Sequence, residues 1–206
     1  MSAAPIRRTP MSRHHAALGA HLELEAGWEI PAAYEGDQKH LRTSVGLADL
    51  TPRAKIDVRG GVEGPLGVAG DGLVARIAPE WALVLDAPGA EEILLPKLEH
   101  AANAGAMVTD ATHLFAGFAI AGPMLDEALA RLTSWDPATL GPGEATGAPI
   151  GEVRAVVARR ELGVPLLEVY TATEFGHYAW ETFIEVVAGL GGGPVGWNAL
   201  RAEGWR

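Results

Sequence analysis

The order of strand and helix patterns along residues 55–190 constrains the fold of this chain more than any other feature. Runs that alternate apolar and polar side chains, typical of half-buried strands, are separated by segments with helical periodicity. The expected strands are 55–59, 73–77, 81–86, 107–112, 114–120, 150–160 and 165–171, and the expected helices are 90–104, 124–132 and 178–190. Because strands follow strands without strict strand–helix–strand alternation, we expect an α+β fold with helices packed on antiparallel sheets.

The first fifty residues predict fewer regular elements. Residues 1–10 are polar and predict a mobile N-terminus, and residues 11–206 are expected to form one domain. The expected elements are a helix over 13–24, a loop over 27–36 and a helix over 37–44. Ser12 and Asp37 are suitable caps for these two helices, because their side-chain oxygens accept hydrogen bonds from free backbone N–H groups.

The charge of the chain excludes two classes of partner. Its 26 acidic and 16 basic residues give a net charge of −10. Nucleic acids and anionic membranes attract clustered Lys and Arg, so we expect neither as a partner. The absence of cysteine rules out disulfides and thiolate catalysis. No signal peptide is recognised, and the most apolar stretch carries Asp110 and His113, so a cytoplasmic location is expected.

Common catalytic patterns are missing from the sequence. The segment around Ser44 lacks the nucleophile elbow because Arg42 stands where glycine is required. The glycine-rich run at 189–193 lacks the dinucleotide fingerprint because Pro194 replaces the last glycine. Three histidines lie near the N-terminus: His14, His15 and His21. They could bind a metal, but without an HExxH pattern we interpret them as helix-surface residues and expect no metal site.

Two parts of the chain carry the motifs of a known family. The front segment contains Leu18-Gly19-Ala20, Gly27-Trp28-Glu29-Ile30-Pro31, Tyr34, Val45-Gly46-Leu47-Ala48-Asp49-Leu50-Thr51 and Lys55-Ile56-Asp57-Val58. The last part contains Glu174-Phe175-Gly176 and Leu200-Arg201-Ala202-Glu203-Gly204. These motifs resemble the aminomethyltransferase (T-protein) of the glycine cleavage system. The segment 76–85 is similar to the gamma subunit of heterotetrameric sarcosine oxidase.

The resemblance implies both a fold and a ligand. The fold would be a folate-binding domain of the T-protein and sarcosine-oxidase-gamma kind, lacking the β-rich domain that follows it in the enzymes. The ligand would be tetrahydrofolate. An exposed Trp205 beside Trp197 would then leave an apolar patch for a partner subunit or a second copy, unless the last residues fold back and bury both rings.

The resemblance also assigns candidate site residues. Glu174 matches a glutamate that contacts the pterin ring, although an acid at a helix N-terminus is an equally good interpretation. Arg201 matches an arginine near the ligand. Tyr170 and Trp28 complete the expected folate-binding set, with Trp28 otherwise a buried anchor. Asp71 is the nearest counterpart of the catalytic aspartate, and an Asp-Gly turn is its alternative.

Two functions follow from the resemblance. The first is a tetrahydrofolate-binding, aminomethyltransferase-like protein that takes part in one-carbon transfer or demethylation. The second is a non-catalytic subunit or binding module of a larger oxidase or demethylase complex. The front and C-terminal motifs favour a folate ligand, whereas the short segment around Asp71 favours a subunit without catalysis of its own.

Overall fold

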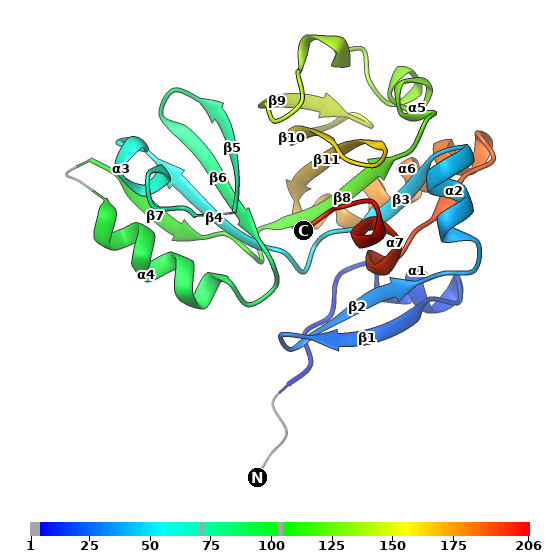
Figure 1. Cartoon of the computed structure of the whole chain (residues 1–206), viewed down its shortest axis with the longest axis horizontal. Coiled ribbons are helices and arrows are strands. Elements are labelled where there is room, and N and C mark those ends of the chain that lie inside the picture. Colours follow the sequence, from blue (N-terminus) through cyan, green and yellow to red (C-terminus); the bar gives the residue numbers. More distant parts are fainter. Residues whose placement is uncertain (1–4, 71, 103–104) are drawn as a thin grey trace.

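Three β-sheets make up the fold. The computed structural model of the chain describes residues 5–70, 72–102 and 105–206. A six-stranded sheet has the order β12-β3-β8-β11-β10-β9, a four-stranded sheet the order β5-β6-β4-β7, and β1 and β2 form a hairpin. In Figure 1 the four-stranded sheet and its helices form the left-hand body, and the hairpin lies below the six-stranded sheet. The predicted α+β class with antiparallel sheets and packed helices is confirmed.

The six-stranded sheet carries the larger core. Its strands are β3 (Gly46–Asp49), β8 (Phe115–Ala121), β9 (Ala145–Ile150), β10 (Val153–Glu161), β11 (Pro165–Ala172) and β12 (Gly193–Pro194). All neighbours pair antiparallel except β12 and β3. Helices α5 (Leu125–Leu132) and α6 (Gly176–Gly189) pack on one face, where Leu129 and Phe183 meet Leu167 of β11. Each helix is amphipathic, so burial of its apolar side stabilises the sheet beneath it.

Two separate groups of elements, here called covers, pack on the opposite face of this sheet. Around Leu166 and Ala119 the cover comes from the hairpin, α2 and α7. Their bounds are β1 (His21–Glu25), β2 (Trp28–Ala33), α2 (Asp37–Thr43) and α7 (Trp197–Ala202). Around Val156 and Tyr170 the cover comes from the four-stranded sheet. The two covers meet over the middle of β11.

The four-stranded sheet is a second layer with its own helices. Its strands are β4 (Ala54–Arg59), β5 (Leu73–Ala78), β6 (Trp81–Asp86) and β7 (Met107–Asp110), and its helices are α3 (Glu63–Leu66) and α4 (Glu91–Ala101). Side chains such as Val58 and Leu98 join this sheet to α4. The predicted hairpin of 73–77 with 81–86 is confirmed as β5 and β6. Within the described ranges, no helix is both long and apolar enough to cross a membrane.

The N-terminal prediction needs correction. The helix expected over 13–24 ends at Ala17 of α1 (Ser12–Ala17), and the loop expected over 27–36 contains β2. The turn between β1 and β2 has positive φ at both central residues, Ala26 (46°) and Gly27 (79°). This backbone matches the right-handed twist of a two-stranded hairpin, which is why the chain turns here instead of continuing a helix.

Three further strands, besides the two of the hairpin, were not predicted from the sequence because they are short or lie in glycine- and proline-rich segments. They are β3, β9 and β12. The strand β9 carries Gly147 and Pro149 at the sheet edge, so its sequence does not show strand propensity. The helix expected over 124–132 begins one residue later, at Leu125. Most of the strands that were not predicted therefore lie at the edge of a sheet, where the pairing partner rather than the local sequence decides the conformation.

Part of the expected mobile segment 1–10 lies against the hairpin. The Arg7 amide donates to the Gly27 carbonyl at 2.8 Å, and the Glu29 amide donates to the Arg7 carbonyl at 2.9 Å. Arg7 also forms an ion pair with Glu91 of α4 at 3.0 Å. Thr9 is buried. This short stretch thus joins the hairpin to the left-hand body.

The two C-terminal tryptophans are buried, so the predicted exposed patch is absent from the described residues. Trp197 and Trp205 pack edge to face at 5.0 Å between ring centroids. The Trp197 indole donates to the Asp49 carbonyl at 2.7 Å. The Trp205 indole donates to Glu168 at 3.0 Å. The last residues fold back on the sheet because both indole N–H groups find buried acceptors there.

A buried polar chain joins α1 to the sheet. His15 Nε2 lies 2.8 Å from Asp49 Oδ2, and the Tyr34 hydroxyl lies 2.7 Å from His15 Nδ1. Burial raises the pKa of Tyr34, so its hydroxyl donates to Nδ1 and the Nε2–H donates to Asp49. Burial works to raise the pKa of Asp49, but the hydrogen bond from His15, together with hydrogen bonds from Thr51 and Thr9, holds it below its usual value. Asp49 is therefore a buried carboxylate that depends on His15.

We predict that His15→Ala destabilises the fold by about 3–5 kcal/mol, because it leaves the Asp49 carboxylate buried without this donor. The neighbouring His14→Ala is the control, since His14 is partly exposed and should cost less than about 1 kcal/mol. Urea unfolding at pH 7 measures both variants. Similar midpoints for the two variants would contradict the prediction.

Candidate functional site

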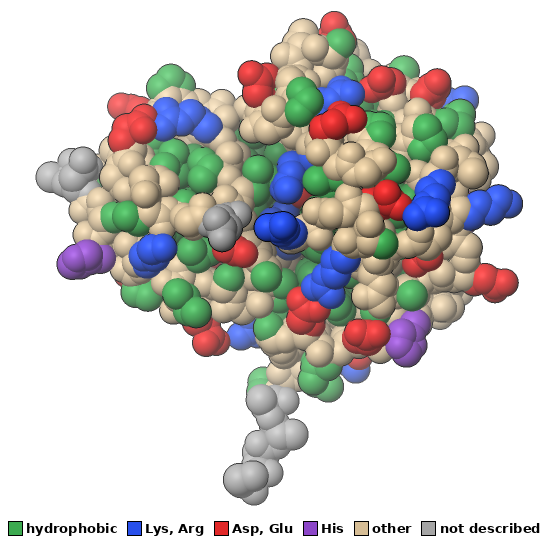
Figure 2. All heavy atoms as spheres, in the orientation of Figure 1, with side chains coloured by type: hydrophobic (Ala, Val, Ile, Leu, Met, Phe, Trp, Pro, Cys, Tyr) green, Lys and Arg blue, Asp and Glu red, His purple; other side chains and the backbone are tan. Residues whose placement is uncertain are grey.

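The candidate site is a cleft between the four-stranded and six-stranded sheets, with a volume of about 510 Å³. It is lined by Arg53, Gly72, Leu73, Val74, Leu85, Asp86, Arg160, Gly204 and Arg206. Figure 2 shows basic side chains along the hollow in the middle of this face. Three arginines and one aspartate give the lining of the cleft a formal charge of 3 − 1 = +2, which the buried Glu168 beside Arg53 reduces to +1, in a chain whose net charge is −10. Such a cleft attracts an anionic ligand.

Glu168 of β11 organises the wall of the cleft. Its carboxylate is fully buried and accepts from Arg53 Nη1 at 3.0 and 2.9 Å. The Tyr170 hydroxyl donates to it at 2.8 Å, and Arg160 Nη1 lies 3.4 Å away. With the Trp205 indole as a further donor at 3.0 Å, each carboxylate oxygen accepts from at least two donors. This satisfies a buried charge that would otherwise be costly.

The protonation states within this cluster are fixed by burial and by Glu168. Burial works to lower the pKa of Arg53, but the neighbouring Glu168 carboxylate raises it, and the pKa lies above its usual value. Burial raises the pKa of Tyr170, and Glu168 raises it further. Tyr170 is therefore a neutral phenol that donates to Glu168, and Arg53 is a permanent cation at the cleft wall.

The alternation of β11 explains why Glu168 and Tyr170 reach this place. Residues 166, 168 and 170 share one face of the strand, and residues 167 and 169 face α5 and α6. The Tyr170 ring lies over Gly117 of the neighbouring β8, where an added Cβ would come within 2.8 Å of the ring. Glycine at this position makes room for the ring between the sheets.

Lys55 holds the turn that presents Arg53. Its buried ammonium donates to the carbonyls of Thr51, Arg53 and Thr112 at 2.7, 2.9 and 3.2 Å. Three acceptors match the three N–H donors of a protonated lysine. Burial nevertheless lowers the pKa of Lys55 to about 7. Lys55 is thus a positioning residue whose charge state affects the stability of the cleft wall.

We predict that the stability of the wild type relative to Lys55→Met rises between pH 7 and pH 9. The folded pKa of about 7 lies below the usual 10.5. In this window the unfolded chain binds the proton and the folded chain does not, so raising the pH favours folding by about 2 kcal/mol. Urea unfolding of both proteins at the two pH values measures the difference. An equal difference at pH 7 and pH 9 would contradict it.

A second hollow of about 500 Å³ adjoins the cleft along β5. Val74 lines both spaces, and the second also contacts Trp135 and Arg76. The cleft supplies Arg53, Arg160 and Arg206, and the second hollow supplies the Trp135 ring together with Arg76 and Glu144. The two hollows suit an elongated ligand that carries carboxylates and a flat ring.

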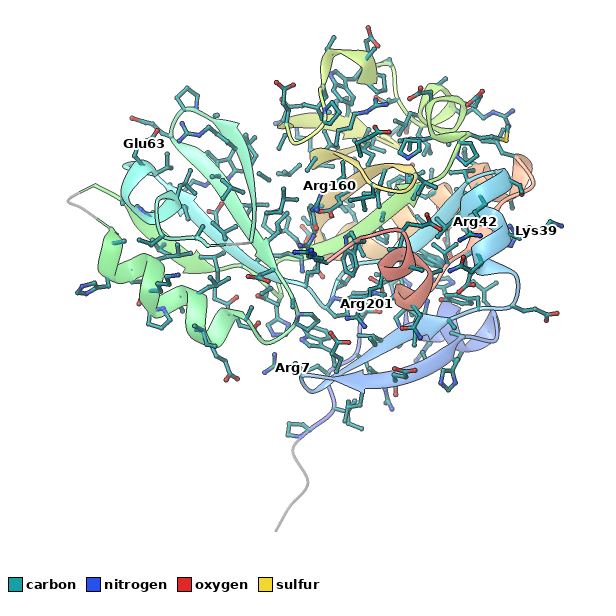
Figure 3. All side chains as sticks on the ribbon, viewed as in Figure 1. Arg7, Lys39, Arg42, Glu63, Arg160 and Arg201 are labelled. Carbon is teal, nitrogen blue, oxygen red and sulfur yellow. The ribbon has the colours of Figure 1, made fainter. Side chains whose placement is uncertain are left out.

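Two of the predicted ligand residues lie away from this cleft. Glu174 is exposed on the 3₁₀ turn η2 (Thr173–Phe175), just before α6. Arg201 of α7 donates to both oxygens of Glu25 at 2.7 and 2.8 Å. Figure 3 shows Arg160 in the middle of the molecule beside β10 and Arg201 lower, beside α7. The lining residues of the cleft include neither Glu174 nor Arg201.

The other three predicted residues have different surroundings. Tyr170 belongs to the Glu168 cluster at the cleft wall. Trp28 is buried and stacks on His113 at 5.2 Å between ring centroids, which places it at the junction of hairpin and left-hand body. Asp71 lies outside the described residues. At the cleft wall, therefore, the predicted residue Tyr170 lies with side chains that were not predicted from the sequence.

The missed residues are Arg53, Glu168 and Arg160. Glu168 stands inside the apolar run Leu166-Leu167-Glu168-Val169, at a strand position expected to be buried. A carboxylate at such a position requires a buried cation or several donors, so this signal was present in the sequence. The sequence did not indicate which cation pairs with Glu168, because Arg53 is 115 residues away along the chain.

Comparison with known proteins adds a relationship by sequence. No protein-family model matches the chain. The aminomethyltransferase of Rubrobacter xylanophilus is 27% identical over 232 residues, a match that covers 96% of this chain. The match covers 61% of that protein, so the chain spans about three fifths of the length of the protein that it resembles.

Two solved structures share the fold of this chain. The glycine cleavage system aminomethyltransferase T of Bartonella henselae has a TM-score of 0.78 at 17% identity, covering 96% of this chain and 62% of that one. A chain of heterotetrameric sarcosine oxidase from Corynebacterium sp. U-96 has a TM-score of 0.67 at 17% identity, covering 89% and 96%. The predicted fold of the T-protein and sarcosine-oxidase kind is confirmed.

Proposed function

We propose that this chain binds a reduced folate in the cleft between its two larger sheets, as an aminomethyltransferase-like protein in one-carbon transfer. The observation that carries the proposal is the positive cleft built on the Arg53–Glu168 pair in a relative of the aminomethyltransferases. Tetrahydrofolate is an elongated molecule with a flat pterin ring and a glutamate carboxylate tail. Both its length and its charge suit the cleft and the adjoining hollow.

In this proposal the residues of the cleft have different tasks. Arg160 is partly exposed and forms only a long contact with Glu168, at 3.4 Å, so its guanidinium is available to a carboxylate of the ligand. Arg53 is 2% exposed and is held by Glu168, so it supplies fixed positive charge and positions the wall. Glu168 and Tyr170 orient Arg53 and are positioning residues. Folate, when bound, would supply the one-carbon carrier.

The proposal is tested by calorimetric titration of the full chain with tetrahydrofolate and with 5-formyltetrahydrofolate. We expect Arg160→Ala to weaken binding at least tenfold, because a charge-assisted hydrogen bond contributes about 1.5–3 kcal/mol. Arg154→Ala is the matched control, since Arg154 is exposed on the same strand and does not line the cleft. Its affinity should equal that of the wild type.

A further variant separates this proposal from the assignment that the sequence motifs suggest. Glu174→Gln should leave folate affinity unchanged if the ligand occupies the cleft, because Glu174 is not among its lining residues. Weaker binding by Glu174→Gln together with normal binding by Arg160→Ala would move the folate site to η2. A flat titration of the wild type at millimolar folate would overturn folate binding altogether.

A second candidate function is that of a binding subunit in a larger oxidase or demethylase. It is favoured by the match to nearly the whole of one chain of the heterotetrameric sarcosine oxidase. The chain also exposes several large apolar side chains, which soluble monomers carry singly but seldom in groups. Leu114, Phe175 and Tyr178 are each at least 45% exposed and come from neighbouring segments around η2.

We predict that the purified chain forms a dimer or a complex with an oxidase-type subunit. Light scattering at micromolar concentration measures the mass of the chain alone, and co-purification from its native host with mass spectrometry identifies a partner. Phe175→Ser should shift a dimer towards monomer, whereas Ile93→Ser, at a more exposed apolar residue on α4, should not. A monomer with no co-purifying subunit and with full one-carbon transfer activity would contradict the second candidate.

A further inference from the structure

A cluster of two histidines and a glutamate lies outside the cleft, between α1 and α6. His14 Nε2 of α1 lies 3.2 Å from His177 Nδ1 of α6. The same nitrogen lies 3.8 Å from Glu181 Oε1, one helical turn beyond His177. The sequence analysis interprets His14 as a helix-surface residue. The fold adds two groups of metal-ligand type that lie more than 160 residues away along the chain.

The spacing of the two ring nitrogens is that of ligands sharing one ion. With Zn–N distances of 2.0–2.1 Å and tetrahedral angles, two ligating nitrogens lie about 3.3–3.4 Å apart. The observed 3.2 Å is within a few tenths of an ångström of this value. The 3.8 Å to Glu181 is longer, so its carboxylate must move closer to complete a site. Side-chain rotation allows this movement because Glu181 is 68% exposed.

The helices hold the two imidazoles in place. His14 precedes His15, which is buried and bonded to Asp49 and Tyr34, so the start of α1 is anchored to the sheet. The His14 ring also lies beside the Trp180 ring of α6, 6.4 Å between centroids. Residues 177 and 181 are four apart on a helix and share one face. The ligands therefore come from two rigid elements, which reduces the entropy lost on binding.

We propose that His14, His177 and Glu181 form a surface site for a divalent transition metal of the zinc class. Two imidazoles and a carboxylate suit Zn²⁺, with water in the remaining position. Among the described residues, no group of three His, Asp or Glu side chains is already arranged around one point. Rotation of Glu181 is thus the step that completes the site. The net charge of −10 favours a cation at the surface.

The proposal is tested by calorimetric titration of the untagged full chain with Zn²⁺ at pH 7.5. We expect one strong site per chain, and a loss of affinity of at least about tenfold in His14→Ala and in His177→Ala. Glu181→Gln should weaken binding by less, because both imidazole ligands, His14 and His177, remain. His100→Ala, at an exposed position on α4, is the matched control and should bind like the wild type.

Thermal unfolding provides a second measurement that also checks folding of the variants. Zn²⁺ should raise the Tm of the wild type and of His100→Ala, because an ion that binds only the folded chain stabilises it. The rise should disappear in His14→Ala, although this variant unfolds cooperatively without zinc. Equal zinc affinity in His14→Ala, His177→Ala and the wild type would overturn the proposal and leave the pair as a hydrogen bond only.

Discussion

The buried Glu168 carboxylate is the contact on which the arrangement of the layers depends. Its donors come from four parts of the chain: Arg53 before β4, Tyr170 on β11, Arg160 on β10 and Trp205 near the C-terminal end. Removing Arg53 would leave the Glu168 anion without its buried countercharge, and removing Glu168 would leave the Arg53 cation without its own. The carboxylate thus holds the four-stranded sheet, the six-stranded sheet and the folded-back end in one relative position.

The Glu168 cluster contributes both to the stability of the fold and to the charge of the proposed ligand cleft. The same arginines that neutralise Glu168 give the cleft its positive lining. In a chain of net charge −10, concentrating cations in one hollow needs a fixed anion behind them, or their mutual repulsion would open the wall. Glu168 supplies that anion from inside the sheet. The part of the fold shared with aminomethyltransferase T therefore contains a cleft whose charged wall is held in place by the core of the protein.

The sequence predicted the fold class and most long elements, because their apolar periodicity is decided locally. Residues 81–86 and 178–190 show such periodicity, and β6 and α6 lie there. The hairpin was not predicted because its second strand, β2, shows no strand pattern in the sequence. It becomes a strand by pairing with β1 across the Ala26–Gly27 turn. The motifs led to Glu174 and Arg201, whereas Glu168 and Arg53 depend on a contact between distant segments. Periodicity indicates which side chains are buried, but it does not say which buried charges meet.

The alternation of β11 has a consequence for how this chain can diverge. Successive residues of the strand face different neighbours: Leu167 and Val169 meet α5 and α6, Leu166 meets α7, and Glu168 lies between the covers. Inserting or deleting one residue within the strand would exchange these faces. The carboxylate would enter a dry helical interface, and a leucine would stand among the arginines. Homologous chains can therefore vary β11 by substitution, but a change of length has to be absorbed in the turns at its two ends.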